Sequence, residues 1–300
     1  MTFLTKHCLL CGANERIQEL YPRTFSPEDL TPEVFSARRV TEHFHYAIVR
    51  CLNCGLIFSR EILPDETLAS LYAQSTVTFA EYTDIIRRDY WRCIAPYLDG
   101  SPKEAALEIG CSNGFFLEEL LSRGFGTVAG CEPSIEAKAR SSPAVRDAIT
   151  TEFFREGLYG RETFDLVCSF QTLDHLSDPV SVLRTSRDIL KPGGLVYFIT
   201  HNTDGLQAKL LGEKSPIIDV EHIYLFNKRT MRRLLDQCGF EVLAVSDVKN
   251  NYPLDYWLRM FPMAGRRKDR LRALFRSIGL GSVAVPLRAG NMFVVARRPR

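Results

Sequence analysis

Two short segments in the first 55 residues share the pattern Cys-x-x-Cys-Gly, at 8–12 and 51–55. Each offers two thiolates from a tight turn, and the glycine after the second cysteine permits positive φ there. A redox Cys-x-x-Cys or two chance pairs would not explain why both copies carry this glycine. Four thiolates around one ion are typical of tetrahedral structural zinc, with no position left open for catalysis. The sequence therefore predicts one structural zinc ion bound by Cys8, Cys11, Cys51 and Cys54.

Length and composition fit a soluble chain with one large domain and one small one. The chain has 300 residues, of which 45% are hydrophobic and 25% charged, as is ordinary for globular proteins. No apolar run approaches the ~18–20 residues that span a bilayer, and the first residues lack the apolar segment of a signal peptide. Nine cysteines, an odd number, argue against a secreted disulfide framework. We therefore expect a cytoplasmic protein.

The charge is unevenly distributed along the chain. The net charge is only +2, but residues 255–300 carry eleven Lys and Arg against two Asp and Glu. Such an excess of positive charge indicates that this part of the chain meets an anionic partner.

A strand–turn–helix–strand pattern lies between residues 105 and 132. We predict a buried strand at 105–109, a turn of small residues at 110–114, a helix at 115–123 and a second strand at 127–132. Gly124 ends the helix. This pattern is half of a doubly wound α/β sheet, in which ligands bind beyond the carboxyl ends of the strands.

The turn in this pattern distinguishes between two kinds of ligand. A dinucleotide fingerprint requires glycine where this chain has Ser112 and Phe115. The pattern Glu-x-Gly-x-x-x-Gly at 108–114 instead lets the chain curl beneath a ligand without phosphates. Glu132 ends the second strand 22 positions after Gly110, where one carboxylate can accept hydrogen bonds from both hydroxyls of a ribose.

Together these residues resemble the class I S-adenosylmethionine-dependent methyltransferases, and the likeness covers residues 85–250 and 290–298. The resemblance implies a seven-stranded, Rossmann-like α/β sheet with S-adenosylmethionine as cofactor. It also implies that Glu108 supports the turn and that Gly110 and Gly114 pack against the methionine and ribose portions of the cofactor. The full set of residues implied at the cofactor is Glu108, Gly110, Cys111, Ser112, Gly114, Glu132, Phe170 and Gln171.

Later segments match this family in their order along the chain. The expected elements are strands at 164–171, 195–200 and 241–246, helices at 179–190 and 228–238, a turn at 191–194 and an antiparallel last strand at 291–296. We therefore divide the chain into a zinc-binding domain (1–65), a helical linker (66–100) and a methyltransferase domain (101–300) with a basic helical insertion at 250–288.

Candidates for a catalytic base follow two of the predicted strands. His175 comes after the strand at 164–171, and Glu221 and His222 come after the strand at 195–200. A carboxylate can raise the basicity of a neighbouring imidazole or position it, so His222 is the preferred base, supported by Glu221, and His175 is the second candidate. The alternatives are that His175 only begins a helix and that the Glu-His pair only braces its loop.

The combination of domains suggests a class of acceptor. A four-cysteine domain ahead of a methyltransferase domain resembles bacterial sugar methyltransferases, including those that act on nucleotide-linked deoxysugars. In the carbon-methylating members, a His after the fourth strand and a Glu-His pair after the fifth serve the acceptor, as His175, Glu221 and His222 would here. Asp219 stands where those enzymes carry an aromatic hydroxyl, so oxygen and carbon methylation both stay open. We expect a small-molecule or carrier-linked sugar as substrate, and no nucleic acid.

The insertion at 250–288 contains an amphipathic helix with basic flanks. Its apolar residues are Leu271, Leu274, Phe275 and Ile278, and its basic residues are Arg266, Arg267, Lys268, Arg270, Arg272 and Arg276. We expect a cap over the active site with a solvated basic face, a clamp for a sugar diphosphate, or weak contact with an anionic membrane surface. The sequence does not indicate an oligomeric state.

Two other functions compete with sugar methylation. A zinc-ribbon RNA methyltransferase needs a basic ribbon, whereas the Lys and Arg of this one are offset by Glu15, Glu19, Glu28, Asp29, Glu33 and Glu42. The chain also lacks, after the strand at 164–171, the Asn/Asp-Pro-Pro-aromatic motif typical of amino-group methylation on bases. The second rival is a non-catalytic cofactor-binding scaffold, against which the candidate bases argue.

Overall fold

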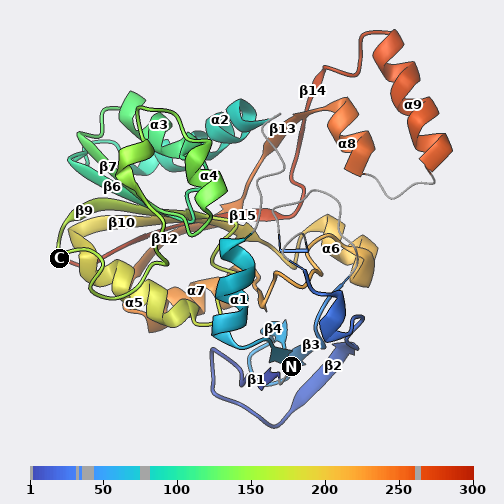
Figure 1. Ribbon diagram of the computed structural model, residues 1–300, viewed down its shortest axis with the longest axis horizontal. Helices are drawn as coiled ribbons and strands as arrows, with labels where there is room; N and C mark the ends of the chain where they lie inside the picture. Colours follow the sequence, from blue (N-terminus) through green and yellow to red (C-terminus); the bar gives the residue numbers. More distant parts are fainter. Residues whose placement is uncertain (1–2, 32–33, 36–43, 75–81, 261–264) are drawn as a thin grey trace.

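A seven-stranded sheet forms the centre of the molecule (Figure 1). The computed structural model describes residues 3–31, 34–35, 44–74, 82–260 and 265–300. Within them the strands lie in the order β12 (Glu241–Asp247), β15 (Asn291–Arg297), β10 (Leu190–His201), β9 (Phe164–Phe170), β6 (Ala105–Ile109), β7 (Thr127–Cys131) and β8 (Ile149–Thr150). β15 is antiparallel to both of its neighbours, and the other pairs are parallel. The doubly wound α/β sheet predicted from the sequence is confirmed.

Helices cover both faces of this sheet. One face carries α2 (Thr83–Ile94) and α3 (Phe115–Ser122), and the other carries α5 (Pro179–Ile189) and α7 (Lys228–Gln237) (Figure 1). Successive residues of a strand point to opposite faces, so Ala106 of β6 packs in the core with α2 and α3, whereas Leu107 packs in the core with α5 and α7. Because both faces are covered, the central strands are mostly apolar, and every residue of β9 is buried, including Asp165 and Ser169.

The elements predicted from the sequence lie close to the observed ones, with two differences. β8 has only two residues, too few for a pattern, and is not predicted. β10 begins at Leu190, so the turn predicted at 191–194 lies inside this strand. The register of β10 against β9 shifts between Leu190 and Leu195, where Gly193 has a φ of 84° that favours glycine.

The N-terminal strands form their own small sheets. β1 (Leu4–Thr5) pairs with β5 (Glu61–Ile62), and a four-stranded sheet has the order β11 (Tyr224–Leu225), β4 (Ile57–Ser59), β3 (Ile48–Cys51) and β2 (Ile17–Tyr21). β11 belongs to the connection between β10 and α7, which also contains α6 (Leu206–Leu211). The N-terminal sheet is therefore completed by a strand from the connection between β10 and α7, close to the predicted Glu-His pair.

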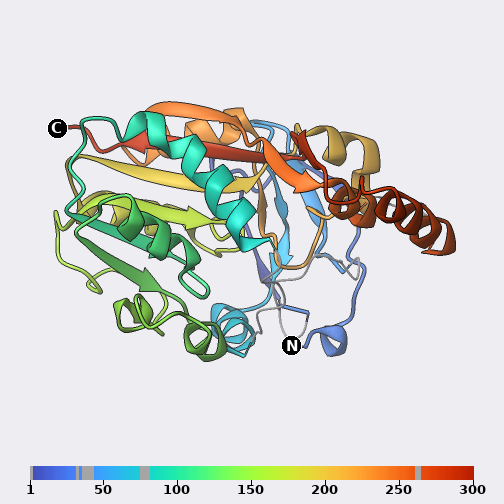
Figure 2. The ribbon, with the colours of Figure 1, turned by 90° about the horizontal axis from the view of Figure 1, so that it is seen from above.

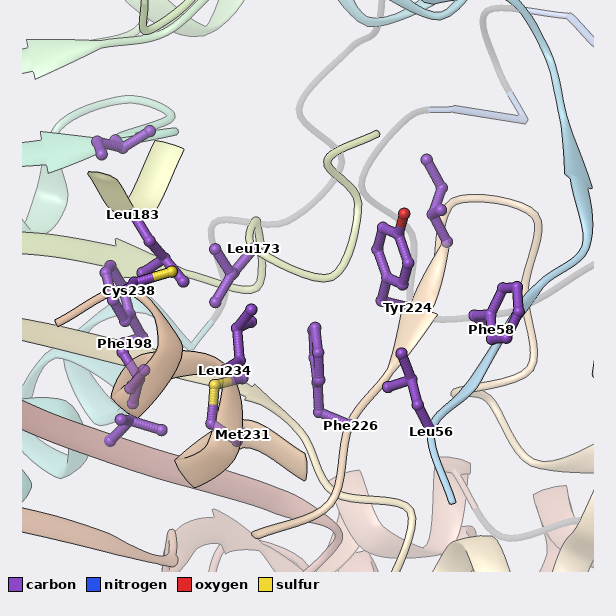
Figure 3. Packing of buried hydrophobic residues seen from close by; sticks show 14 of the residues in the cluster. Leu56, Phe58, Leu173, Leu183, Phe198, Tyr224, Phe226, Met231, Leu234 and Cys238 are labelled. Atoms are coloured by element: carbon purple, nitrogen blue, oxygen red, sulfur yellow. The ribbon is translucent and has the colours of Figure 1, made fainter. Parts of the chain in front are cut away.

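One hydrophobic core joins the N-terminal part to the main sheet. Figure 3 shows Phe58 of β4 and Leu56, which directly precedes this strand, beside Tyr224, followed by Phe226 and then Met231 of α7. Polar contacts add to this packing, because Nη2 of Arg229 donates a hydrogen bond to the carbonyl of Cys54 (2.9 Å) and Nε2 of Gln237 donates one to the carbonyl of Leu10 (2.9 Å). Helix α7 thus holds both cysteine turns. The domain boundaries given above stay a prediction.

Two further helices separate the N-terminal sheets from β6. They are α1 (Asp65–Ala73) and α2, both within the segment predicted as a helical linker, and α4 (Ile135–Ala139) follows β7. Asp89 of α2 is buried, and its carboxylate accepts two hydrogen bonds from Asn251. The donors are the backbone nitrogen of Asn251 (2.8 Å) and its side-chain Nδ2 (2.6 Å). This contact fixes the base of the insertion. No helix in the described part of the chain is both long enough and apolar enough to cross a membrane.

The insertion extends away from the sheet (Figures 1 and 2). It consists of a ribbon of β13 (Asn250–Pro253) and β14 (Ala284–Leu287), with α8 (Leu254–Met260) and α9 (Gly265–Ser277) between them. Leu274 and Ile278 stay 55% and 57% exposed, and no described residue of α8 or α9 lines the cavity described below. The expected cap over the active site is therefore not what the described residues form. Contact with a membrane surface stays a prediction.

Part of the positive charge of α9 is neutralised within the insertion. Arg272 makes two hydrogen bonds of 3.0 Å to the carboxylate of Asp255, and Arg276 adds two more. The bonds from Arg272, opposed by burial and assisted by Arg276, lower the pKa of Asp255 to about 2. These two arginines are thus engaged within the insertion, and contact of its other basic residues with an anionic partner stays a prediction.

We predict that Asp255→Asn loosens α9. The native pKa lies below the ordinary value of about 3.9, so the ion pair stabilises the insertion above that pH, and the stabilisation is lost as the pH falls through about 2. At neutral pH the variant should show faster tryptic cleavage within α9, while its overall unfolding midpoint changes little. Asp269→Asn, on the same helix, is the control. Equal cleavage of wild type and D255N would contradict the prediction.

Candidate active site

A cavity of about 320 Å³ lies beyond the carboxyl ends of β6, β7 and β9. This is the place where doubly wound sheets bind ligands, and the volume is within the range of small-molecule sites. Its lining includes Glu108, Glu132, Glu152 and Glu221 but no Lys or Arg among the described residues. Four acidic side chains without a cation favour a positively charged ligand over a nucleotide phosphate.

Glu132 organises the loops at one end of the cavity. Its Oε2 accepts a hydrogen bond from the backbone nitrogen of Ser112, and its Oε1 accepts one from that of Ser134, both at 2.9 Å. Burial raises the pKa of Glu132, and these two hydrogen bonds oppose the rise. The carboxylate thus ties the end of β7 to the turn after β6, with its remaining lone pairs available for ligand hydroxyls.

Glu108 is a buried carboxyl group at the floor of the same end. Its Oε2 has no hydrogen-bond partner within the described chain. Burial, with the negative charge of Glu132 adding to it, raises the pKa of Glu108 well above its ordinary value. An unpartnered polar atom of this kind costs about 1–3 kcal/mol, so a cationic or hydrogen-bonding ligand at this end would relieve a penalty.

The backbone around the cavity adopts conformations that are rare for residues with side chains. Ser112 and Gln171, which follow β6 and β9, both have a φ of 50°, in the left-handed region. Gly110 has a φ of 72°, and a Cβ atom there would lie 2.5 Å from Oγ1 of Thr172. Such local strain concentrates at functional sites. Here the strained residues lie in the loops after β6 and β9, which approach each other closely beside the cavity.

Most of the residues implied at the cofactor line the cavity. They are Glu108, Gly110, Ser112, Glu132, Phe170 and Gln171. Cys111 and Gly114 are not among the lining residues. Cys111 is buried, and a Cβ on Gly114 would lie 2.9 Å from Cγ2 of Val145. Gly114 therefore permits close packing behind the loop. The assignment of all eight residues to cofactor binding stays a prediction.

The predicted catalytic residues meet at the other end of the cavity. His175 and Glu221 line it, together with Phe35 and Tyr72. The two loops that carry them are joined because the carbonyl of Asp174 accepts hydrogen bonds from the backbone nitrogens of residues 223 (2.8 Å) and 224 (3.1 Å). Contacts through the backbone therefore bring together segments that are about fifty positions apart in the sequence.

His222 lies behind His175. Its ring is buried and packs edge to face against the rings of His175 and His201, with centroids 4.9 and 4.4 Å apart. Asp174 completes the group, because its Oδ2 lies 2.8 Å from Nδ1 of His201. We call Asp174, His175, His201 and His222 the histidine cluster. His222 does not line the cavity, so His175 is the imidazole nearest to a ligand there.

The charges of the histidine cluster follow from its burial. Burial would raise the pKa of Asp174, but the hydrogen bond from His201 and the neighbouring imidazoles hold it well below its usual range. Burial lowers the pKa of His175, against the opposing charge of Asp174. Burial and the two neighbouring histidines lower the pKa of His222 still further. At neutral pH the cluster therefore holds an ionised carboxylate beside two neutral imidazoles, with lone pairs available.

Several residues at this end were not among the predicted site residues. Asp174 precedes His175 directly, so its position was available from the sequence. His201 ends β10 and Tyr72 lies in α1, and neither belongs to a recognisable motif. Oη of Tyr72 lies 3.4 Å from Nδ1 of His175, a contact between segments about a hundred positions apart that only the folded chain reveals.

The four cysteines of the N-terminal turns also converge. Their Sγ atoms lie within 4.8 Å of one another, and all four thiols are free of disulfides. The two closest approaches are 3.3 Å (Cys8 to Cys54) and 3.6 Å (Cys11 to Cys51). A tetrahedral ion with bonds of about 2.3 Å to sulfur requires about 3.8 Å between sulfurs, so this cluster fits such an ion with small adjustments.

Both cysteine turns have the same backbone structure. Gly12 and Gly55 have φ values of 69° and 82°, and each donates a backbone hydrogen bond of 2.8 Å to the carbonyl of the first cysteine in its turn. The conformation predicted for the trailing glycines is thus observed in both copies.

Relatives with curated descriptions match part of the chain. A tRNA U34 carboxymethyltransferase of Vibrio atlanticus (strain LGP32) is 26% identical over 164 residues, which cover 52% of this chain and 51% of that protein. A ubiquinone biosynthesis O-methyltransferase of Rhizobium rhizogenes is 35% identical over 104 residues, covering 32% of this chain and 40% of that protein. The chain therefore spans about half the length, or less, of these relatives.

Solved structures align over most of the chain at low identity. An S-adenosylmethionine-dependent methyltransferase of Mesorhizobium loti aligns with a TM-score of 0.47 and 19% identity, covering 70% of this chain and 98% of that one.

A family match covers the part of the chain that builds the cavity. Residues 80–245, more than half of the chain, match the family described as "Methyltransferase domain". These residues include the cavity ends of β6, β7 and β9 and the whole histidine cluster, whereas the four cysteines and the insertion lie outside the match. The chain therefore belongs to the methyltransferase domain family.

Proposed function

We propose that this protein transfers a methyl group from S-adenosylmethionine to a hydroxyl or carbon of a sugar or glycan precursor. The observation that carries the proposal is a single cavity with two chemically different ends. Glu108 and Glu132 line it from the carboxyl ends of β6 and β7, and His175 and Glu221 line it from the loops after β9 and β10. The first end suits a cationic cofactor with a ribose, and the second suits an acceptor that must lose a proton.

The chain's own residues would divide the work as follows. Glu132 would accept hydrogen bonds from the ribose hydroxyls, and Glu108 would face the cationic portion of the cofactor. When bound, S-adenosylmethionine supplies a methyl group already activated on a sulfonium. What the protein must add is alignment of the acceptor and, where needed, removal of its proton. His175 and Glu221 face the acceptor, while Asp174, His201 and His222 stand behind His175 and position it.

A sugar fits the acceptor end on chemical grounds. Sugar hydroxyls are donors and acceptors that an imidazole and a carboxylate can bind. The rings of Phe35 and Tyr72, 5.5 Å apart and nearly perpendicular, offer apolar surface for the C–H groups of a pyranose. The four-cysteine cluster ahead of the catalytic part is the further support, because that arrangement resembles sugar methyltransferases.

A panel of acceptors tests this proposal. Purified protein with isotopically labelled S-adenosylmethionine should transfer label to nucleotide-linked deoxysugars or to carrier-linked sugars. Carbon–proton correlation spectra of the product then distinguish an O-methyl from a C-methyl group. Transfer to none of these acceptors, together with transfer to an RNA or a quinol, would reject the sugar assignment. Cofactor binding without turnover on any acceptor would favour a non-catalytic scaffold.

RNA is a second candidate acceptor, supported by the name of the relative from Vibrio atlanticus. The acidic residues of the N-terminal part weaken this reading, and Glu19 lies exposed on β2 beside Gln18. Retention of RNA that falls steeply with salt would support it.

We also propose that Cys8, Cys11, Cys51 and Cys54 bind one structural zinc ion. The sulfur separations and the matched turns support it. Burial opposes ionisation of Cys51, but backbone hydrogen bonds from Cys54 and Asn53, with contributions from neighbouring thiols, lower its pKa to about 7. At least one thiolate is thus readily formed at neutral pH, as binding requires. These four cysteines do not line the cavity, so the ion would stabilise the fold rather than take part in the reaction.

We predict that Glu132→Ala weakens S-adenosylmethionine binding by ~1–3 kcal/mol, since ribose hydroxyls would lose their acceptor in a buried site. Calorimetry measures this directly. Because Glu132 also binds the backbone of Ser112 and Ser134, the unfolding midpoint should fall as well. Glu136→Ala is the matched control, because Glu136 is paired with Arg140 on α4. Unchanged cofactor affinity in E132A would show that the ribose lies elsewhere.

A further inference from the structure

Three unpartnered polar atoms lie together behind the acceptor end of the cavity. They are Oδ1 of Asp174, Nε2 of His175 and Nδ1 of His222, all buried and without a hydrogen-bond partner in the described chain. One ligand atom from each of these residues lies within 4.8 Å of the others, and Nε2 of His175 is 4.0 Å from Oδ1 of Asp174. Asp174 and His222 are only 1% and 7% exposed.

Burying these three atoms without a partner would lower the stability of the folded protein. Each buried polar atom without a partner costs about 1–3 kcal/mol, and such atoms in native proteins call for an explanation. Three at one point, from two separate loops, indicate that they share a partner.

The other polar atom of each residue is held in place. Oδ2 of Asp174 lies 2.8 Å from Nδ1 of His201, and Nδ1 of His175 lies 3.4 Å from Oη of Tyr72. His222 makes a hydrogen bond with the backbone of Ile217. Metal-binding histidines and carboxylates characteristically use one atom for the ion and the other for such an orienting contact. Each of the three side chains is thus held by one polar atom, while its other polar atom has no hydrogen-bond partner in the described chain.

We infer that Asp174, His175 and His222 bind a divalent transition-metal ion at a second site, distinct from the four-cysteine cluster. Two imidazoles and one carboxylate are a ligand set for zinc, iron(II), cobalt(II) or nickel rather than for calcium or magnesium, which take oxygen ligands. Three protein ligands leave at least one coordination position open. The absence of thiolates separates this site chemically from the first one.

The site adjoins the cavity through His175, which lines it. A cation at this point would favour the ionised form of an acceptor hydroxyl that reaches it. This role rests on the proposed function, whereas metal binding itself does not and can be measured without cofactor or acceptor.

Cobalt(II) titration of the full-length protein tests the inference. The protein is first dialysed against a mild chelator that leaves the four-thiolate ion in place, and binding is followed by calorimetry and absorption. We expect one further equivalent of cobalt, without thiolate-to-cobalt charge-transfer absorption because the ligands are nitrogen and oxygen. The bound ion should also raise the unfolding midpoint with cobalt concentration.

Variants separate ligands from their neighbours. His222→Gln and His175→Gln should each abolish the second equivalent or weaken it at least ~100-fold, and using both keeps the test valid if one misfolds. His201→Gln, which removes the orienting contact to Asp174 and the ring contact to His222 but no proposed ligand, should weaken it ~10–100-fold. His45→Gln, a buried histidine of the N-terminal part paired with Glu213, should leave it unchanged. Binding of no further cobalt by wild type, or an equivalent that survives in both H175Q and H222Q, overturns the inference.

Discussion

Replacing Cys51 with serine is expected to remove the structural zinc and to unfold the N-terminal part. Structural zinc contributes on the order of 10–16 kcal/mol in small zinc-binding peptides, which exceeds the net stability of most small domains. The buried cysteines of the two turns belong to the same hydrophobic core as the other buried residues of the N-terminal part and α7, so loss of the ion would disturb this shared core. Metal analysis should show the loss of one equivalent, and limited proteolysis should begin within residues 1–60.

The effect of Cys51→Ser should extend to the active site. β4 pairs with β11, the backbone nitrogen of Ser59 donates to the carbonyl of Ile223 (2.8 Å), and Oγ of Ser59 donates to the carbonyl of His222 (3.2 Å). Loss of the N-terminal sheet therefore releases the loop that carries Glu221. We expect turnover to fall when the metal is lost, although none of the four metal-binding cysteines lines the cavity.

Cys238→Ser is the matched control for this prediction. Cys238 is equally buried and lies in the same hydrophobic core, but it is outside the four-cysteine cluster. This variant should keep its zinc and lose only packing energy. A full zinc complement in C51S, or equal zinc loss in C238S, would show that the four-thiolate assignment is wrong.

Local patterns were sufficient to predict the main sheet. The segment at 105–132 combines a buried strand, a small-residue turn and an amphipathic helix, and each of these is a short-range property of the sequence. β11 could not be predicted in this way, because its two residues are a strand only through pairing with β4, more than 160 positions earlier. The exposed position of α9 is also a long-range outcome, since its apolar face matches that of a packed helix.

Only those residues of the candidate site that belong to a recognisable sequence motif could be predicted. Glu132 follows from its spacing to Gly110, and His175 from its place after a strand. His201 has no such signal, because its role depends on where β10 ends relative to Asp174. The sequence also ranks His222 above His175 as the base, whereas the structure places His175 at the cavity and His222 behind it. Which of the two histidines reaches the cavity depends on how the loops after β9 and β10 pack together, and this packing is not visible in the sequence.

Kinetics of paired variants should decide between these two histidines. If His175 serves the acceptor, His175→Gln should lower turnover by ~10²–10⁴-fold, the usual contribution of a positioned base, because glutamine can neither take up a proton nor hold the inferred ion there. His222→Gln should lower it less, since His222 acts through the ring of His175 or a shared ion. Affinity for S-adenosylmethionine should stay near the wild-type value in both, because Glu108 and Glu132 lie at the other end of the cavity.

The pH dependence adds a readout that a merely structural role would not change. Burial lowers the pKa of His175 below its ordinary value. In protein freed of the inferred second ion, the acidic limb of kcat/KM should therefore lie below pH ~6.5. That limb should disappear from the residual activity of H175Q. His45→Gln should retain both the rate and the limb. If H222Q is the more damaged variant, the ranking from the sequence is correct, and if neither variant loses activity, transfer needs no protein base and the histidine cluster only braces its loops.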